Sequence, residues 1–315
     1  MTTRSPLLDR SEYVEQAYLF GLLSERIAQR VPMQELLEQL RHELLATTRL
    51  PMAIDFMLTE LRHSGLMGPA MRRLQHYFNP FQTYLVEESE KETGRFGITS
   101  ALQILHGDAK FRADYVPPDA NGRRTTNDSL SRSDSQPKTE RDEPAPKPQA
   151  AFFFQFEVLC RNRLNYDRGL TAMSLDPLYE IDHAKWILNL RAQIGLVDLA
   201  DLLFLASMDY FEQMLEKKIP VEGKGPFLFG RKEGRIAFAN RRKEPLYLFG
   251  AMQRHLGYPE VPRLKPADKT MELIPQMARR IERLESRIKL MEEERRASLD
   301  ITQFYKRENG GVPPP

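Results

Sequence analysis

A heptad pattern near the C-terminus constrains this chain more than any other feature of its sequence. Apolar residues recur there at alternating spacings of three and four, which is the period of a coiled-coil seam: Ile274, Met277, Ile281, Leu284, Ile288 and Met291. Isoleucine takes the a positions, and Met, Leu and Met take the d positions, a combination that favours two parallel strands. The pattern predicts a coiled-coil helix over residues 267–298.

The charges beside the seam favour a parallel homodimer. Arg280 and Arg287 take g positions, and Glu285 and Glu292 take the e positions that a parallel partner sets opposite them. An antiparallel pair would face Arg with Arg and Glu with Glu, which costs energy. The alternative is a surface helix that packs the same stripe on its own body, because the seam spans only about three heptads. Pro275 predicts that the helix begins or kinks there.

Proline residues divide the N-terminal third into short helices. Helices are predicted to open at Pro32, Pro51, Pro69 and Pro80, because a first-turn N–H has no helical partner for proline to remove. One further helix is predicted over residues 98–113. We expect this half of the chain to share one hydrophobic core with the helices that follow residue 150. Two separate domains joined by a linker are the alternative.

The second half is predicted to hold longer apolar helices and one β-hairpin. A long helix runs from Phe152 through Leu164, another begins near Asp176, and a third covers residues 196–211. Two β-prone runs, 227–230 and 235–239, flank Lys232, Glu233 and Gly234, and Gly234 can supply the positive φ of a hairpin turn. A helix over Pro245 to Leu256 follows the hairpin.

These patterns predict a mainly α fold, in which a multi-helix body carries one short β-hairpin and a C-terminal coiled-coil helix. The body is predicted to have a first half at 10–115 and a second half at 151–218, separated by a disordered insert at 116–150 that is poor in apolar residues. A basic hairpin-plus-helix module with a proline-rich hinge follows at 219–266. The coiled-coil helix at 267–298 and a tail at 299–315 complete the predicted segments.

The basic module suggests a second class of function. Between residues 217 and 265 the chain holds twelve Lys and Arg but only four Glu, whereas the whole chain carries +2. Interleaved aromatic residues would suit phosphate contacts and base stacking. The candidate residues for binding a polyanion such as nucleic acid are Arg231, Lys232, Arg235, Arg241, Arg242 and Lys243. The alternative is a basic face that is solvated or meets an acidic surface of the same protein.

Two Glu-x-x-His steps suggest a metal site. They pair Glu60 with His63 and Glu180 with His183 on separate predicted helices. Together with one glutamate from each of two other helices, for which Glu25 and Glu157 are candidates, this pattern resembles the ligand set of ferritin-like di-iron proteins. The resemblance implies a helical di-metal carboxylate enzyme. The alternative is that the two Glu-x-x-His steps arise by chance, because glutamate is common in this sequence. That alternative predicts no cofactor.

Composition sets the remaining limits. The hydrophobic fraction of 41% allows a sizeable core, and no apolar run reaches the ~20 residues that span a bilayer. The first ten residues lack the apolar core of a secretory signal. A single cysteine, Cys160, permits no internal disulfide and is expected to be a buried, inert thiol. These features predict a cytoplasmic protein with no membrane span.

The favoured interpretation is an interaction or scaffold protein rather than an enzyme. It would associate with itself through the C-terminal helix and bind a protein partner that the sequence does not identify. The charged cluster around Arg161, Arg163, Asp167 and Arg168 is expected to be a buried structural network rather than a site.

Overall fold

The computed structural model describes residues 7–29, 31–91, 95–114, 148–217, 227–262 and 269–304, with the side chains of the last segment described at Pro275 and over 277–295. These residues form fourteen helices and two isolated β-bridges, so the described part of the chain is mainly α, as predicted. Apart from residues 148–150, the insert predicted at 116–150 lies outside the described residues. Most of the predicted tail also lies outside them.

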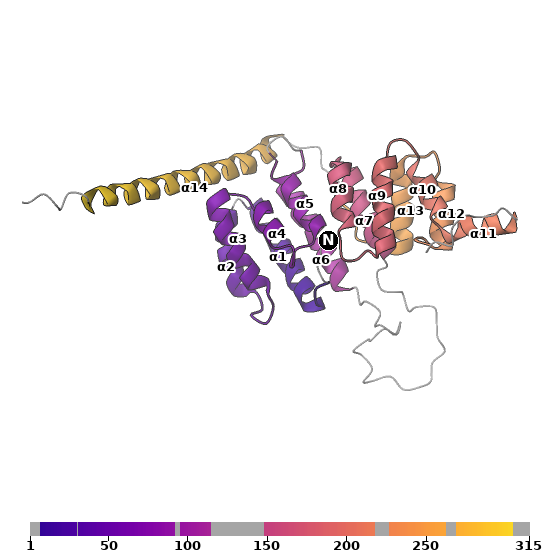
Figure 1. Cartoon of the computed structure of the whole chain (residues 1–315), viewed down its shortest axis with the longest axis horizontal. Coiled ribbons are helices and arrows are strands. Elements are labelled where there is room, and N and C mark those ends of the chain that lie inside the picture. The colour runs from indigo at the N-terminus through magenta and orange to yellow at the C-terminus, as the bar shows by residue number, and fades with distance from the viewer. Residues whose placement is uncertain are drawn as a thin grey trace, which may run out of the picture.

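In the first half of the body, the described residues form six helices that lie next to one another (Figure 1). They are α1 (Arg10–Ala28), α2 (Met33–Glu43), α3 (Leu50–Ser64), α4 (Gly68–Arg73), α5 (Pro80–Ser89) and α6 (Ile98–Ala113). As predicted, α2 to α5 begin at or beside proline. The start of α5 is also fixed by a capping box, in which the Asn79 and Gln82 side chains each bind the other residue's backbone N–H.

The described part of the second half holds seven helices, and an eighth extends away from the body over α3 (Figure 1). The seven are α7 (Pro148–Arg161), α8 (Tyr166–Ser174), α9 (Ile181–Gln193), α10 (Leu199–Leu205), α11 (Met208–Glu216), α12 (Arg231–Ala239) and α13 (Pro245–Leu256). The eighth is α14 (Lys269–Phe304), which passes through Pro275 as one helix rather than beginning there.

The buried apolar side chains of both halves belong to one cluster that runs from α1 to the segment after α13. In the first half, α1 packs along α6. In the second half, the cluster centres on the Phe-rich face of α7. The ring of Phe152 lies 5.1 Å from Trp186 of α9 and 5.9 Å from Phe229, measured between ring centroids. Rings packed in this way add to the stabilisation from burying their area.

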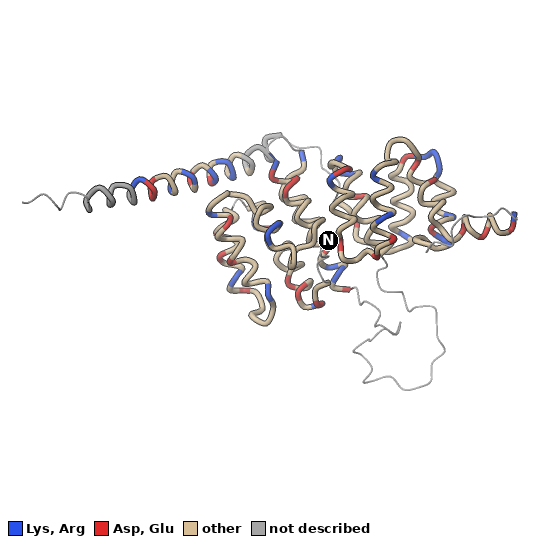
Figure 2. Tube along the Cα trace, viewed as in Figure 1, with Lys and Arg blue, Asp and Glu red and all other residues tan. Residues whose placement is uncertain are grey.

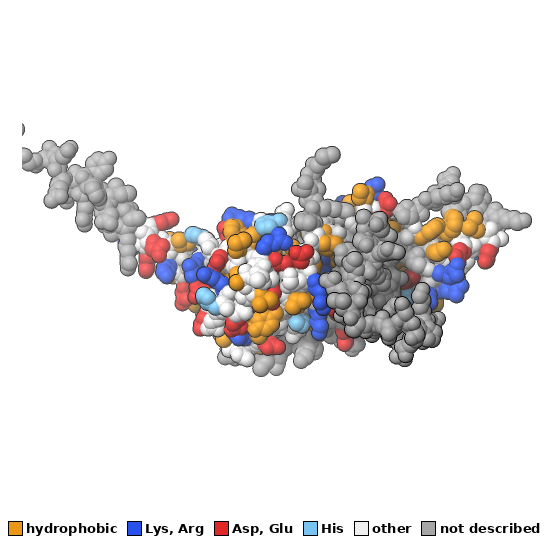
Figure 3. All heavy atoms as spheres, turned by 90° about the horizontal axis from the view of Figure 1, so that it is seen from below, with side chains coloured by type: hydrophobic (Ala, Val, Ile, Leu, Met, Phe, Trp, Pro, Cys, Tyr) orange, Lys and Arg blue, Asp and Glu red, His pale blue; other side chains and the backbone are white. Residues whose placement is uncertain are grey.

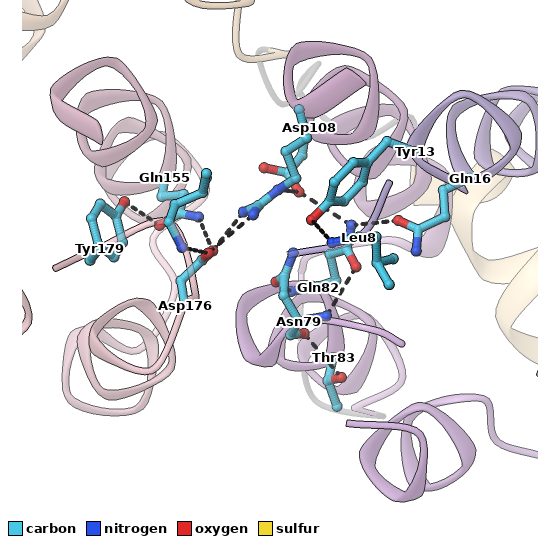
Figure 4. A network of polar contacts seen from close by, with 12 residues as sticks. Leu8, Tyr13, Gln16, Asn79, Gln82, Thr83, Asp108, Gln155, Asp176 and Tyr179 are labelled. Carbon is cyan, nitrogen blue, oxygen red and sulfur yellow. Dashed lines mark hydrogen bonds and ion pairs between the residues drawn. The ribbon is translucent and has the colours of Figure 1, made fainter. Parts of the chain in front are cut away.

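A buried ion network lies where the two halves meet (Figure 4). Arg112 of α6 is 1% exposed. Its Nε donates to Asp108 one turn earlier at 2.8 Å, and its two terminal nitrogens donate to Asp176 at 3.0 and 2.6 Å. Gln155 of α7 also donates to Asp176 at 2.8 Å. A bidentate pair of this kind fixes both the distance and the orientation between the elements that carry it.

The charged cluster predicted as a buried network lies nearer the surface. Arg168 is 43% exposed and reaches Glu87 and Glu88 of α5, while Arg161 pairs with the buried Glu157 of its own helix. The prediction placed the buried network in the wrong residues. It missed Arg112 because the residues that surround it come from distant parts of the chain.

The predicted β-hairpin at 227–239 is wrong. Residues 231–239 form α12, and the β-prone run before it pairs instead with the α10–α11 junction, where Met208 N–H donates to the Phe229 carbonyl at 3.0 Å. Gly234 is helical and makes close packing possible, since a Cβ there would lie 2.3 Å from Ser207 Oγ and 2.8 Å from Asp209 Cβ. Glycine at this position therefore allows α12 to approach the start of α11 closely, and it does not form a turn.

We expect alanine to have opposite effects at two helical glycines. In Gly234→Ala the new methyl group collides with Ser207 and Asp209 at the start of α11, and overpacking of this kind costs about 1–3 kcal/mol. In Gly250→Ala of α13 the nearest contact is 3.6 Å away, so alanine should stabilise the protein by about 0.5–1 kcal/mol. Urea unfolding of the two variants checks this. A stable Gly234→Ala variant would contradict the close packing of α12.

Three other helix boundaries differ from the prediction. The long apolar helix ends at Arg161 instead of continuing to Leu164, because Arg163 adopts a left-handed conformation with a φ of 51° and Asn165 caps α8. The helix expected near Asp176 begins at Ile181. The helix expected over 196–211 is divided into α10 and α11 by Ser207, whose hydroxyl caps α11.

Candidate interaction site

The C-terminal helix contacts the body through its polar face. Among the side chains of α14 that the structure describes, the half-buried ones all lie at b, c or f positions of the heptad, the positions farthest from a coiled-coil seam. They are Pro275, Arg279, Glu282, Arg283, Ser286 and Leu290. The alternative in which the apolar stripe packs on its own body is therefore not the arrangement of this structure.

Specific contacts hold this polar face against α2, α3 and α5. The stem of Arg283 packs on Gly65, the left-handed C-cap of α3, where a Cβ would lie 2.8 Å from Arg283 Cγ. Glu282 accepts a hydrogen bond from the Gln34 backbone at the start of α2. Arg279 and Arg283 also attract Glu90, whose carboxylate accepts from Met67 N–H at 2.6 Å. Burial raises the pKa of Glu90, and these two arginines and the backbone donors oppose that rise.

The seam of α14 faces away from the body. Five of its six residues have described side chains, and each is between 50% and 59% exposed: Met277, Ile281, Leu284, Ile288 and Met291. The side chain of Ile274 lies outside the described residues. An isolated exposed apolar residue is ordinary, but a continuous stripe along one helix marks an interaction surface.

The four charges beside the seam have no ion pair within the described part of the chain. Arg280, Arg287, Glu285 and Glu292 are all exposed there. Basic and acidic residues are interspersed along the described length of α14 (Figure 2). Elsewhere in the described structure, many exposed arginines pair with a carboxylate, as Arg62 does with Glu38.

A groove separates α14 from the start of α2. Its volume is about 570 Å³, and it is lined by apolar side chains that include Val31, Met33 and Ile281. Its charged lining consists of one cation, Arg279, and four carboxylates, which are contributed by Glu35, Glu38, Glu282 and Glu285. The sequence pattern gave no sign of this groove, because its two walls lie more than two hundred residues apart in the chain.

The structure places the four metal candidates in different surroundings. Glu60 pairs with Arg73, and His63 is exposed on the same helix. Glu180 is exposed just before α9, whereas His183 is buried against Tyr179 and Phe229. Of the two additional glutamates, Glu25 is exposed, and Glu157 is buried beside Arg161 and Tyr258. Among the described residues, no three His, Cys, Asp or Glu side chains come close enough together to hold a metal ion.

Half of the polyanion candidates pair with acidic residues of the protein itself. Arg231 pairs with Glu212, Arg235 with Asp209 at 3.2 Å, and Arg241 with Asp201. The acidic partners lie on α10 and α11. The Arg241 guanidinium also stacks over Phe204 and Phe238, at 5.1 and 4.8 Å from the ring centroids. Part of the predicted basic surface is thus neutralised where α12 meets the two preceding helices.

The other three candidates, Lys232, Arg242 and Lys243, are exposed and form no ion pair in the described structure. Apolar side chains also gather at this end of the molecule (Figure 3), where Leu215, Phe227 and Phe238 are exposed.

Burial raises the pKa of the half-buried Cys160 thiol to about 11, which keeps it in the unreactive protonated form at neutral pH.

Comparisons with known proteins do not assign this chain to a family. None of the described helices is both long enough and apolar enough to cross a membrane. The chain matches no family model, no curated protein and no solved structure.

Proposed function

We propose that this protein is a helical scaffold that forms a homodimer through α14, in a parallel two-stranded coiled coil. The observation that carries the proposal is the orientation of the helix. The described side chains that meet the body all lie at b, c or f positions, and the described side chains of the a and d seam and the e and g charges are exposed together. A second copy of the seam can therefore pack against the first without displacing any contact between α14 and its own body.

The charges select the partner and its direction. In a parallel pair, Arg280 of each chain faces Glu285 of the other, and Arg287 faces Glu292. The same pairs become like-charged in an antiparallel arrangement, which disfavours it. The proposed dimer would hold the two bodies on the outer faces of the coiled coil. Each copy would then be free to bind the protein partner that a scaffold requires, and two copies would raise the avidity of that binding.

The molar mass of the full chain tests the dimer. Sedimentation equilibrium at micromolar concentration should give twice the chain mass. The double variant Ile281→Asp with Ile288→Asp should give the mass of one chain, because each partner would bury a charge in the seam. The matched control is Leu205→Asp with Leu215→Asp, which places the same charges on apolar residues that are 52% and 57% exposed elsewhere. The control should remain a dimer, and a monomeric wild type would refute the proposal.

Cross-linking tests the direction of the helices. In a Cys160→Ser background, Met291→Cys should form a disulfide between two copies, because a parallel pair places identical d positions opposite each other, close enough to be bridged. An antiparallel pair would instead bring the d position Met277 opposite the a position Ile288. In that case a mixture of Met277→Cys and Ile288→Cys chains would cross-link, and Met291→Cys alone would not.

A further inference from the structure

The groove between α2 and α14 opens on the e side of the seam. Of its lining residues, Ile281 is an a position and Glu285 is an e position of the heptad. The other wall comes from the start of α2, which contributes Met33 and Glu35. A helix that packed on the seam would therefore lie along the mouth of this groove.

Two carboxylates of the groove are available to a cation from outside. Glu38 already pairs with Arg62, and Glu282 accepts from the Gln34 backbone. Glu35 accepts only a hydrogen bond from Gln39 at 3.3 Å, and neither Glu35 nor Glu285 has an ion pair in the described part of the chain. Both are exposed, and they come from opposite walls of the groove.

The parallel dimer brings a matching cation to this place. Heptad geometry sets Arg280 of the second copy against Glu285, and Arg280 forms no ion pair within its own described chain. We infer that the groove is a second part of the dimer interface and receives Arg280 of the second copy between Glu285 of α14 and Glu35 of α2. This inference rests on the proposed function. If it holds, contacts with the body contribute to the specificity of dimerisation together with the coiled coil.

The dissociation constant of the full-chain dimer tests this contact. Glu35→Lys should raise the constant by about tenfold at low salt, because it sets a cation against Arg280, and the difference should shrink as salt screens the charges. Glu260→Lys is the matched control, since Glu260 is an exposed glutamate that does not line the groove. It should leave the constant close to that of the wild type.

Charge reversal distinguishes the contribution of Glu35 from that of Glu285. The double variant Arg280→Glu with Glu285→Lys restores the ion pair of the coiled coil with its two charges exchanged. In this variant Glu35 repels the glutamate introduced at position 280 of the second copy. Adding Glu35→Lys should therefore tighten this dimer by about tenfold. If Glu35→Lys matches Glu260→Lys and the added reversal changes nothing, the groove inference is overturned while the coiled coil stands. A monomeric wild type would instead remove the proposed function itself.

Discussion

Replacement of Arg112 by methionine is expected to lower the free energy of unfolding by about 3–5 kcal/mol. The guanidinium is 1% exposed and bonds to two carboxylates, Asp108 and Asp176, that are themselves buried. Methionine has a similar length but no charge, so the variant would leave two buried carboxylates without their cation. The loss should be large because the two carboxylates are buried away from water, and their remaining donors, such as Gln155 and Gln82, form neutral hydrogen bonds that do not replace the lost positive charge.

Urea unfolding followed by circular dichroism measures this effect. Arg62→Met is the matched control, because Arg62 pairs with Glu38 at the surface and its side chain is 62% exposed. An exposed pair of this kind contributes at most about 1 kcal/mol, so the control should unfold near the wild-type midpoint. If Arg112→Met were as stable as Arg62→Met, the network would not be what joins the two halves.

Acidification is expected to destabilise the protein through His183. Burial lowers the pKa of this imidazole from 6.5 to about 4, and the nearby Asp182 offsets only part of that shift. Its Nε2 has no hydrogen-bond partner in the described structure, and its ring lies 6.0 Å from Tyr179 and 6.1 Å from Phe229. The unfolded chain therefore binds a proton near pH 6.5, whereas the folded chain does not until about pH 4.

The sign of the pH dependence follows from this difference. The contribution of His183 to stability is complete above pH 6.5 and is lost progressively as the pH falls toward 4, to a total of about 3 kcal/mol. His183→Phe cannot bind the proton, so its stability should fall less than that of the wild type between pH 7 and pH 4.5. His63→Phe changes an exposed histidine and should keep the wild-type pH dependence. Parallel curves for the wild type and His183→Phe would contradict the buried, neutral imidazole.

Local sequence determined most of the helices. Proline at a first turn marked the starts of α2 to α5, and apolar periodicity with flanking turn residues placed α6 at 98–113 and α13 at 245–256. The same kind of signal defined the seam of α14 and its flanking charges. These features were predictable because they depend on neighbours within about one or two helical turns.

Tertiary structure decided what those local signals could not. A β-prone run with a turn-forming glycine became helix α12, because Gly234 lets that helix lie against Ser207 and Asp209. The polar face of α14 met the body, although periodicity alone equally favoured the apolar face packing there. Arg112 became the centre of a buried network through Asp176, sixty-four residues away in the chain. Each outcome depends on which distant segments come into contact. The composition of a single segment does not specify the surface against which that segment packs.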